Sequence, residues 1–96
     1  MFLPFNENVL VNISKSTRKN KKYMATIQNI YTGELNTMHF GSSLYQQYRD
    51  STGLGLYTHL DHLDKKRRYS YIKRHTPNIL PLHFSPGYFS LRYLWE

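Results

Sequence analysis

The sequence predicts a small α+β protein, in which an extended N-terminal arm precedes a small β-hairpin and two or three short helices follow it. Three features carry this prediction. Apolar and polar residues alternate over Tyr23–Phe40, a capped basic stretch covers Leu60–His75, and Ser85-Pro86 opens an aromatic segment near the end. Ninety-six residues are enough for one domain with a modest hydrophobic core.

The first 22 residues are expected to form an extended arm and a basic linker, and residues 23–96 to form the α+β domain with its C-terminal aromatic helix. In the arm, Met1–Ile13, the run Val9-Leu10-Val11 together with Ile13 favours a strand. The linker, Ser14–Lys22, contains five basic residues and no apolar one. We therefore expect the linker to be exposed and mobile in the free protein.

Two strands are predicted in the hairpin. Over Tyr23–Tyr31 every second residue is apolar at first, which places Tyr23, Ala25 and Ile27 on one face. Thr32-Gly33-Glu34 supplies a turn, and Leu35–Phe40 forms the second strand. A break at Gly41-Ser42-Ser43 follows the hairpin.

A short helix is predicted over Leu44–Asp50, where Leu44, Tyr45 and Tyr48 share a face by helical spacing. A longer helix is predicted over Leu60–His75, capped by Thr58 or Asp61 and ended by Pro77.

The longer helix carries two acid–base pairs four residues apart, Asp61–Lys65 and Asp64–Arg68, in the favourable order with the acid first. Its apolar residues do not form one stripe, because Leu63 and Tyr71 lie on one side while Tyr69 and Ile72 lie on another. We therefore expect this helix to be wedged between neighbours.

The last helix begins at Ser85-Pro86, with serine as the N-cap and proline in the first position. It carries five large apolar side chains that a short chain cannot easily bury alone: Tyr88, Phe89, Leu91, Tyr93 and Trp95. They predict either docking into a hydrophobic groove of a partner protein or closure over the hairpin as the other half of the core. The sequence leaves both alternatives open.

Positive charge is the strongest functional signal, since the formal net charge is +7. We expect an anionic partner, which is either nucleic acid phosphate or the acidic face of a protein. The expected contacts are Lys19, Lys21, Lys22, Lys65, Lys66, Arg67, Arg68, Lys73 and Arg74. Tyr69 and Tyr71, which lie between these cations, are suited to stack on bases or to pack on protein.

Catalysis is not predicted, because the chain has no nucleophile motif, no phosphate-binding glycine loop and no convincing carboxylate pair. We expect no cofactor and no small-molecule substrate. His59 and His62 are three residues apart, but without cysteine they match none of the zinc spacings, so we expect no metal. No apolar run is long enough to span a bilayer, and the first residues lack the pattern of a signal peptide.

Three segments together resemble a family of small, functionally uncharacterised basic proteins of nucleo-cytoplasmic large DNA viruses, over about three quarters of the chain by eye. The first thirteen residues fall outside this resemblance. The motifs that carry it are Lys21-Lys22-Tyr23, His39-Phe40-Gly41, Tyr45 and Tyr48, Asp64-Lys65-Lys66-Arg67-Arg68, Arg74-His75, and Phe89-Ser90 with Leu94-Trp95. The resemblance implies no activity and no catalytic residues.

The resemblance implies a non-enzymatic structural component of a virion. The expected role is a minor capsid or cement protein that binds other capsid proteins on the inner side of the shell. Its expected locations are the virion and, during assembly, the host cytoplasm. The alternative is a basic nucleic-acid-binding protein for genome packaging or viral transcription. An enzyme with His59 and His62 as metal ligands is the least favoured hypothesis.

Overall fold

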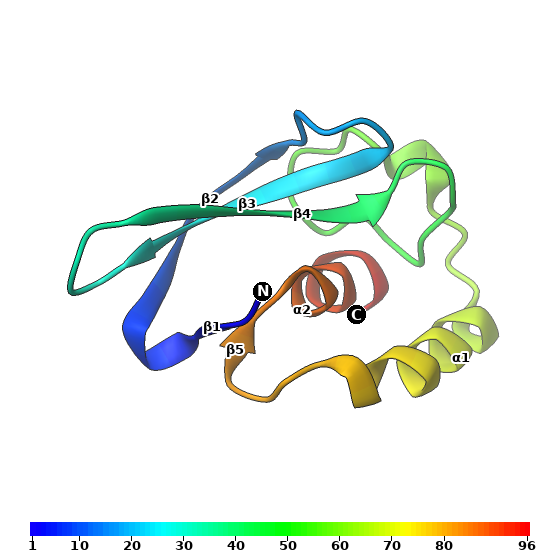
Figure 1. The fold of residues 1–96 in the computed structure, drawn as a ribbon. Helices are drawn as coiled ribbons and strands as arrows, with labels where there is room; N and C mark the ends of the chain where they lie inside the picture. The colour runs from blue at the N-terminus through cyan, green and yellow to red at the C-terminus, as the bar shows by residue number, and fades with distance from the viewer.

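A three-stranded antiparallel sheet lies over the C-terminal helix in the computed structural model, which describes residues 1–96 (Figure 1). The α+β class is therefore confirmed. The strands are β1 (Leu3–Pro4), β2 (Asn8–Lys15), β3 (Lys21–Asn29), β4 (Leu35–Ser42) and β5 (His83–Phe84), and the helices are α1 (Lys65–His75) and α2 (Pro86–Ser90), the latter continued by a π-helical turn, Leu91–Trp95. None of these helices has the length and apolar character that crossing a membrane requires.

The predicted hairpin is confirmed as β3 and β4. Tyr23 pairs with Phe40 and Ala25 with Met38, and Gly33 supplies the left-handed backbone of the turn at φ 75°. Tyr23, Ala25 and Ile27 are all fully buried, as their alternation predicts.

The predicted boundary at residue 22 does not separate an arm from the domain. Strand β2 pairs along β3, with Ile13 opposite Ala25, and β1 pairs with β5. The physical reason is that Leu10 and Ile13 pack against the core, so β2 completes the three-stranded sheet. Only a short turn remains of the predicted linker, with Asn20 in the left-handed region at φ 63°.

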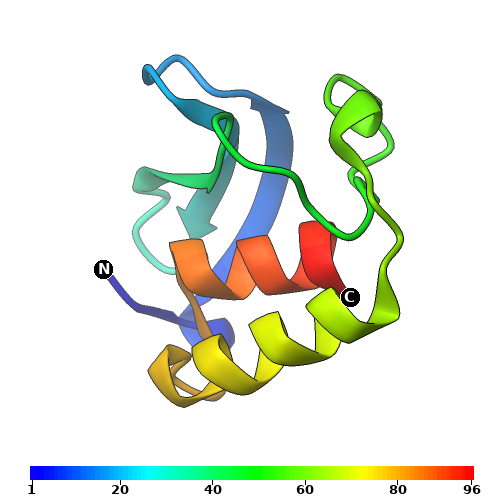
Figure 2. The same ribbon diagram turned by 90° about the vertical axis from the view of Figure 1, so that its right-hand side faces the viewer.

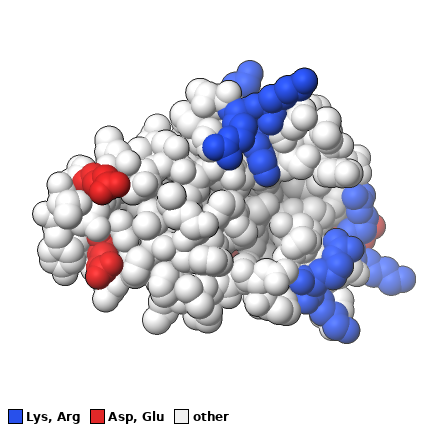
Figure 3. Space-filling view, in the orientation of Figure 1, with Lys and Arg blue, Asp and Glu red and all other residues white.

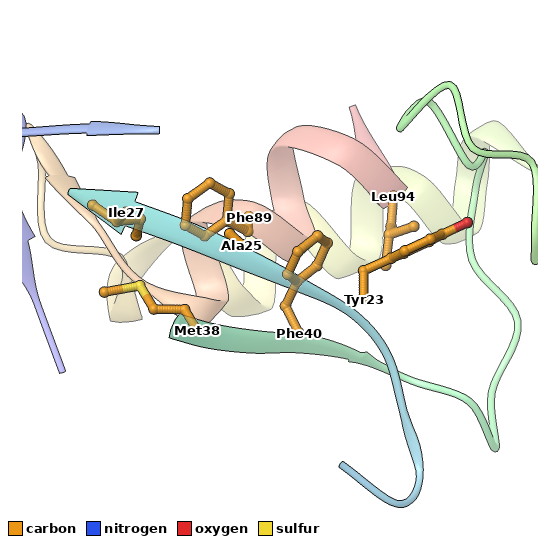
Figure 4. Packing of buried hydrophobic residues seen from close by; sticks show 7 residues of the cluster. All are labelled: Tyr23, Ala25, Ile27, Met38, Phe40, Phe89 and Leu94. Atoms are coloured by element: carbon orange, nitrogen blue, oxygen red, sulfur yellow. The ribbon is translucent and has the colours of Figure 1, made fainter. Parts of the chain in front are cut away.

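The core lies between the sheet and the C-terminal helix (Figure 4). Of the two alternatives for that helix, the structure therefore has closure over the hairpin as the other half of the core. Seven buried side chains form it: Tyr23, Ala25, Ile27, Met38, Phe40, Phe89 and Leu94. Helical spacing pairs Phe89 with Tyr93, yet the structure buries Phe89 with Leu94. These residues are five apart, as the wider i to i+5 repeat of the π-helical turn allows.

The predicted helix over Leu44–Asp50 is absent. This segment is instead an irregular loop, and its backbone bonds go to residues distant in the sequence. The amide of Gln47 donates to the carbonyl of Leu60 at 3.2 Å, and the amide of Arg49 donates to the carbonyl of Leu94 at 3.0 Å. These long-range bonds replace the local ones that a helix would make.

Helix α1 begins at Lys65 rather than at Leu60. Asp64 is its N-cap and accepts hydrogen bonds from two backbone amides of the first turn, while Leu63 has a left-handed backbone at φ 56°, which prevents an earlier start. The helix is not wedged between neighbours. Figure 2 shows α1 beside the C-terminal helix with its other side free, and Tyr69 is 67% exposed.

Candidate anion-binding pocket

A recessed pocket of about 450 Å³ lies between the end of β4, the loop that follows it, α1 and the C-terminal helix. Figure 3 shows a hollow on this face between basic side chains over the β2–β3 turn and basic side chains over α1. None of the residues that line the pocket is acidic. The ionisable and aromatic groups around it are Lys22, Tyr45, Arg67, Tyr71, Arg74, His75 and Trp95.

Lys22 lies at the inner wall of this pocket. Its side chain is only 2% exposed, and its Nζ donates one hydrogen bond, 2.9 Å long, to the carbonyl oxygen of Tyr45. Burial lowers the pKa of Lys22 to about 8, although the charges of Asp50 and Asp61 oppose the change. An ammonium with a single protein acceptor retains donors for a bound anion.

Helix α1 supplies the opposite wall because Arg67, Tyr71 and Arg74 recur at i, i+4 and i+7 and so share a face. The ring of Tyr71 is fixed between two others, stacking on Trp95 at 4.0 Å and on His75 at 4.1 Å between centroids. This stack holds the helix against the C-terminal helix and so positions the two arginines.

The other predicted anion contacts differ in their exposure. Arg68 is half-buried: its Nε donates to the carbonyl oxygen of Trp95 at 2.9 Å, and its guanidinium lies over the ring of Tyr48. Arg68 is therefore engaged with the C-terminal helix and with Tyr48, and Lys22 is not a surface cation. Lys21 is half-buried at the start of β3, and the remaining predicted contacts are exposed: Lys19, Lys65, Lys66, Arg67, Lys73 and Arg74.

The predicted docking residues do not form an exposed apolar face. Phe89 is fully buried and stacks on Phe40 at 5.5 Å, so its predicted docking role is wrong. The rest are half-buried. Tyr88, Tyr93 and Trp95 pack against the core, and Leu91 is also partly covered. The cause is that the hairpin needs a second layer, which this helix provides.

Sequence reasoning missed His75, Tyr45 and Gln46 as pocket residues. Gln46 accepts a hydrogen bond from Arg67 at 2.9 Å between Oε1 and Nη1. The helical spacing of Arg67, Tyr71 and Arg74 was the signal that could have found the α1 wall. Nothing local marks Tyr45, because its place depends on a loop with long-range partners.

A buried acidic cluster lies on the other side of Lys22. Asp50 accepts hydrogen bonds from the hydroxyl of Tyr23, from the amide of Tyr57, and from both the amide and the hydroxyl of Thr52. Burial has the largest single effect and would raise the pKa of Asp50, but the hydrogen bonds from Thr52, Tyr23 and Tyr57 together outweigh it and lower the pKa. Burial and the bond to Asp50 together raise the pKa of Tyr23 to about 12.

The two histidines considered as metal ligands do not share a helix face, since His59 lies in a 3₁₀ turn and His62 lies in the irregular segment before α1. Nδ1 of His62 accepts the amide of Asp64 at 2.9 Å. Burial, with the nearby charge of Arg67, lowers the pKa of His62. No group of three His, Cys, Asp or Glu side chains converges as a metal site would require.

Residues 11–51 match the model of a family of unknown function (DUF5754). The matched region covers most of β2, the whole of β3 and β4, and the loop that contains Tyr45 and Asp50. It includes Lys22 and Gly41 but not α1. No curated protein and no solved structure matches the chain. Over residues 11–51, then, the chain is similar to that family, whose description names no function.

Proposed function

We propose that this protein is a non-enzymatic nucleic-acid-binding protein that holds the phosphate backbone through two groups of cations. The turn group consists of Arg18, Lys19 and Lys21, between β2 and the start of β3. The helix group consists of Lys65, Lys66, Arg67, Lys73 and Arg74 on α1. A strand that crosses the hollow between the groups meets positive charge at both edges.

The observation that carries this proposal is the separation of charge over the surface. In Figure 3, basic side chains gather over the β2–β3 turn and over α1, while the most prominent acidic ones lie at the opposite end, by the β3–β4 turn, and a smaller acidic area is visible beside the α1 cations. Asp50 is buried and Asp61 is half-buried, so these two acids do little to neutralise the basic face. Asp64, the exposed cap of α1, keeps its charge but stands against the five cations of the helix group. The exposed rings of Tyr45 and Tyr69 can stack on unpaired bases.

Fluorescence anisotropy with labelled duplex and single-stranded oligonucleotides tests this proposal. Affinity should fall linearly with salt on a double-logarithmic plot, as phosphate contacts require. Lys73→Gln should weaken binding to every sequence and reduce the salt slope by about one. Arg92→Gln removes the same charge outside both groups and should leave the slope unchanged. An absence of binding at low salt would contradict the proposal.

A second candidate is a structural component of a virion, a minor capsid protein that binds other capsid proteins. The resemblance to proteins of large DNA viruses suggests it, and exposed apolar side chains at the tip of the hairpin support it. This hairpin-tip patch consists of Val9, Ile30, Tyr31 and Leu35, which are 46%, 51%, 77% and 59% exposed. Cross-strand pairing places Val9 and Leu35 on either side of Gln28.

Co-sedimentation with nuclease-treated, genome-free capsid shells separates the two candidates. The capsid candidate predicts that a Tyr31→Ser, Leu35→Ser variant is lost from shells while Lys73→Gln is retained. Release of the wild-type protein by the nuclease would favour the nucleic-acid candidate instead.

A further inference from the structure

The pocket contains features that an internal backbone phosphate cannot use. Its inner cation, Lys22, is 2% exposed, and its walls rise on the β4 side and on the α1 side. An internal phosphodiester continues into sugar on both sides, so the strand would meet these walls before its phosphate reached Nζ. A terminal phosphate has one sugar neighbour and can enter the recess.

The number of donors also fits a terminal phosphate. Lys22, Arg67 and Arg74 surround the space with three cationic groups, and the His75 ring lies beside them. A phosphate monoester carries about −1.5 to −2 charges at neutral pH and three terminal oxygens, whereas a diester carries one charge and two such oxygens. A carboxylate would be satisfied by one arginine and would leave the other cations facing each other.

The rim of the pocket can hold a nucleoside. Tyr45 lines the pocket, yet its side chain is 71% exposed, so its ring is free at the mouth. Its backbone is fixed, because its carbonyl oxygen accepts the hydrogen bond from Lys22 Nζ. A base attached to a bound phosphate through one sugar can stack on this ring. The volume of about 450 Å³ exceeds what a phosphate alone would fill.

A second hollow extends the pocket along α1. It is lined by Lys66, Ser70 and Asp64, and it shares Arg67, Arg74 and Trp95 with the first. The two hollows therefore adjoin across the arginines, and a strand whose end occupies the first can continue over the second.

We propose that the pocket formed by Lys22, Arg67, Arg74 and His75 binds a phosphate monoester, carried either by the end of a nucleic-acid strand or by a free mononucleotide. This inference rests on the proposed nucleic-acid binding and assigns one particular phosphate to one site. The protein would then bind the phosphorylated ends of nucleic-acid strands, and the terminal base would stack on Tyr45.

Paired oligonucleotides test the inference. Short single strands of one sequence, labelled internally, carry a 5′-phosphate, a 3′-phosphate or hydroxyl groups at both ends. We expect one phosphorylated strand to bind roughly tenfold or more tightly than the hydroxyl strand, the size of one or two charge-assisted hydrogen bonds. Adenosine monophosphate should compete with that strand and shift the NMR signals of Gly41, His75 and the Trp95 indole.

Neighbouring residues on α1 provide a matched pair of variants. Arg74→Gln removes a pocket charge and should abolish the preference for the phosphorylated strand. Lys73→Gln removes the same charge one residue earlier, outside the pocket, and should weaken the binding of both strands equally. Both side chains are exposed, so both variants should fold. Lys22→Met keeps the packed stem and removes the ammonium, and it should also lose the preference.

The outcomes distinguish this inference from the proposed function. If phosphorylated and hydroxyl strands bind equally and the mononucleotide shifts no NMR signal, the phosphate site in the pocket is overturned. The proposed nucleic-acid binding then still stands. If the mononucleotide shifts the NMR signals of the pocket but no strand binds, the pocket assignment stands and the proposed nucleic-acid binding is overturned. Tighter binding of a phosphotyrosine peptide than of any phosphorylated strand or mononucleotide overturns the assignment to nucleic acid.

Discussion

Two clusters of charge lie on either side of Lys22, and they differ in how completely their groups are satisfied. In the acidic cluster, Asp50 accepts four hydrogen bonds, and Asp61 accepts bonds from the side chain of Gln47 and the amide of Asp50. In the basic pocket, Lys22 has one acceptor, and no acid lines the space.

The difference separates structural charge from charge available to a ligand. A buried charge whose partners are all in place stabilises the native state and has no capacity left for a ligand. Cations that face a space with no acid in its lining repel one another, and an anion that enters the space relieves that repulsion. The comparison predicts that variants of the acidic cluster change stability, while variants of the basic pocket change binding.

Asp50→Ala should have the largest effect on stability. The change leaves the buried hydroxyl of Tyr23 and the amide of Tyr57 without their acceptor, at an expected cost of about 3 kcal/mol in unfolding free energy. Urea unfolding followed by Trp95 fluorescence measures it. Glu34→Ala removes an exposed acid at the hairpin turn and should cost less than about 0.5 kcal/mol. Equal costs for the two variants would break the distinction.

Gly41→Ala should have the next largest effect, because it acts where the pocket meets the core. A Cβ at Gly41 would lie 2.7 Å from Cδ1 of Leu94 and 3.3 Å from Cδ of Lys22, and the φ of +77° is itself strained for alanine. We expect a loss of about 2 kcal/mol or more. Gly53, at φ +83°, has nothing within 4 Å of an added Cβ. Gly53→Ala therefore measures the cost of backbone strain alone, about 1 kcal/mol in unfolding free energy.

Acid should destabilise the protein through Asp50. Its pKa is lower in the folded state than in the unfolded state, so its contribution is fully present above the unfolded carboxyl pKa of about 4. That contribution is lost as the pH falls from there through the folded value. Unfolding free energies measured across this window should decline less steeply for Asp50→Ala than for the wild type. Parallel declines would mean that other groups set the acid limit.

Much of the fold was predictable because its signals are local. The alternation of Tyr23, Ala25 and Ile27 predicts a strand with one buried face, and the structure confirms it, since all three side chains are 0% exposed. Ser85 before Pro86 marks a helix start, and the Ser85 hydroxyl accepts the amide of Tyr88 at 3.1 Å. Each of these signals involves residues fewer than six positions apart.

The rest depends on contacts between distant residues. Gln47 stands in a segment with helical spacing, but its side chain donates to the carbonyl of Tyr57 and to Asp61, which hold the segment as a loop. Lys22 follows other basic residues and looks like a surface cation, yet the position of Leu94 beside Gly41 encloses it. The pocket was therefore beyond prediction, although its three cations, Lys22, Arg67 and Arg74, were each predicted as anion contacts.

Lys22 gives the smallest effect and the sharpest comparison, because pH should change stability and binding in opposite directions. With a folded pKa of about 8 and an ordinary value of 10.5, the unfolded chain binds more protons between these values, so stability rises with pH across that window. Phosphate binding needs the ammonium, so the preference for a phosphorylated strand should fall as the pH rises through about 8.

The other charged or ionisable groups that face Lys22 are Asp50 and Asp61 on the core side and Tyr45, Arg67, Tyr71, Arg74 and His75 across the pocket. The phosphate monoester, with its second pKa near about 6, keeps its charge across this window, so a loss of preference reports on the protein. Anisotropy titrations of the paired oligonucleotides at about pH 7 and about pH 9 measure the loss. In Lys22→Met the preference should be weak at both values. A wild-type preference that stays constant would show that Lys22 does not contact the phosphate.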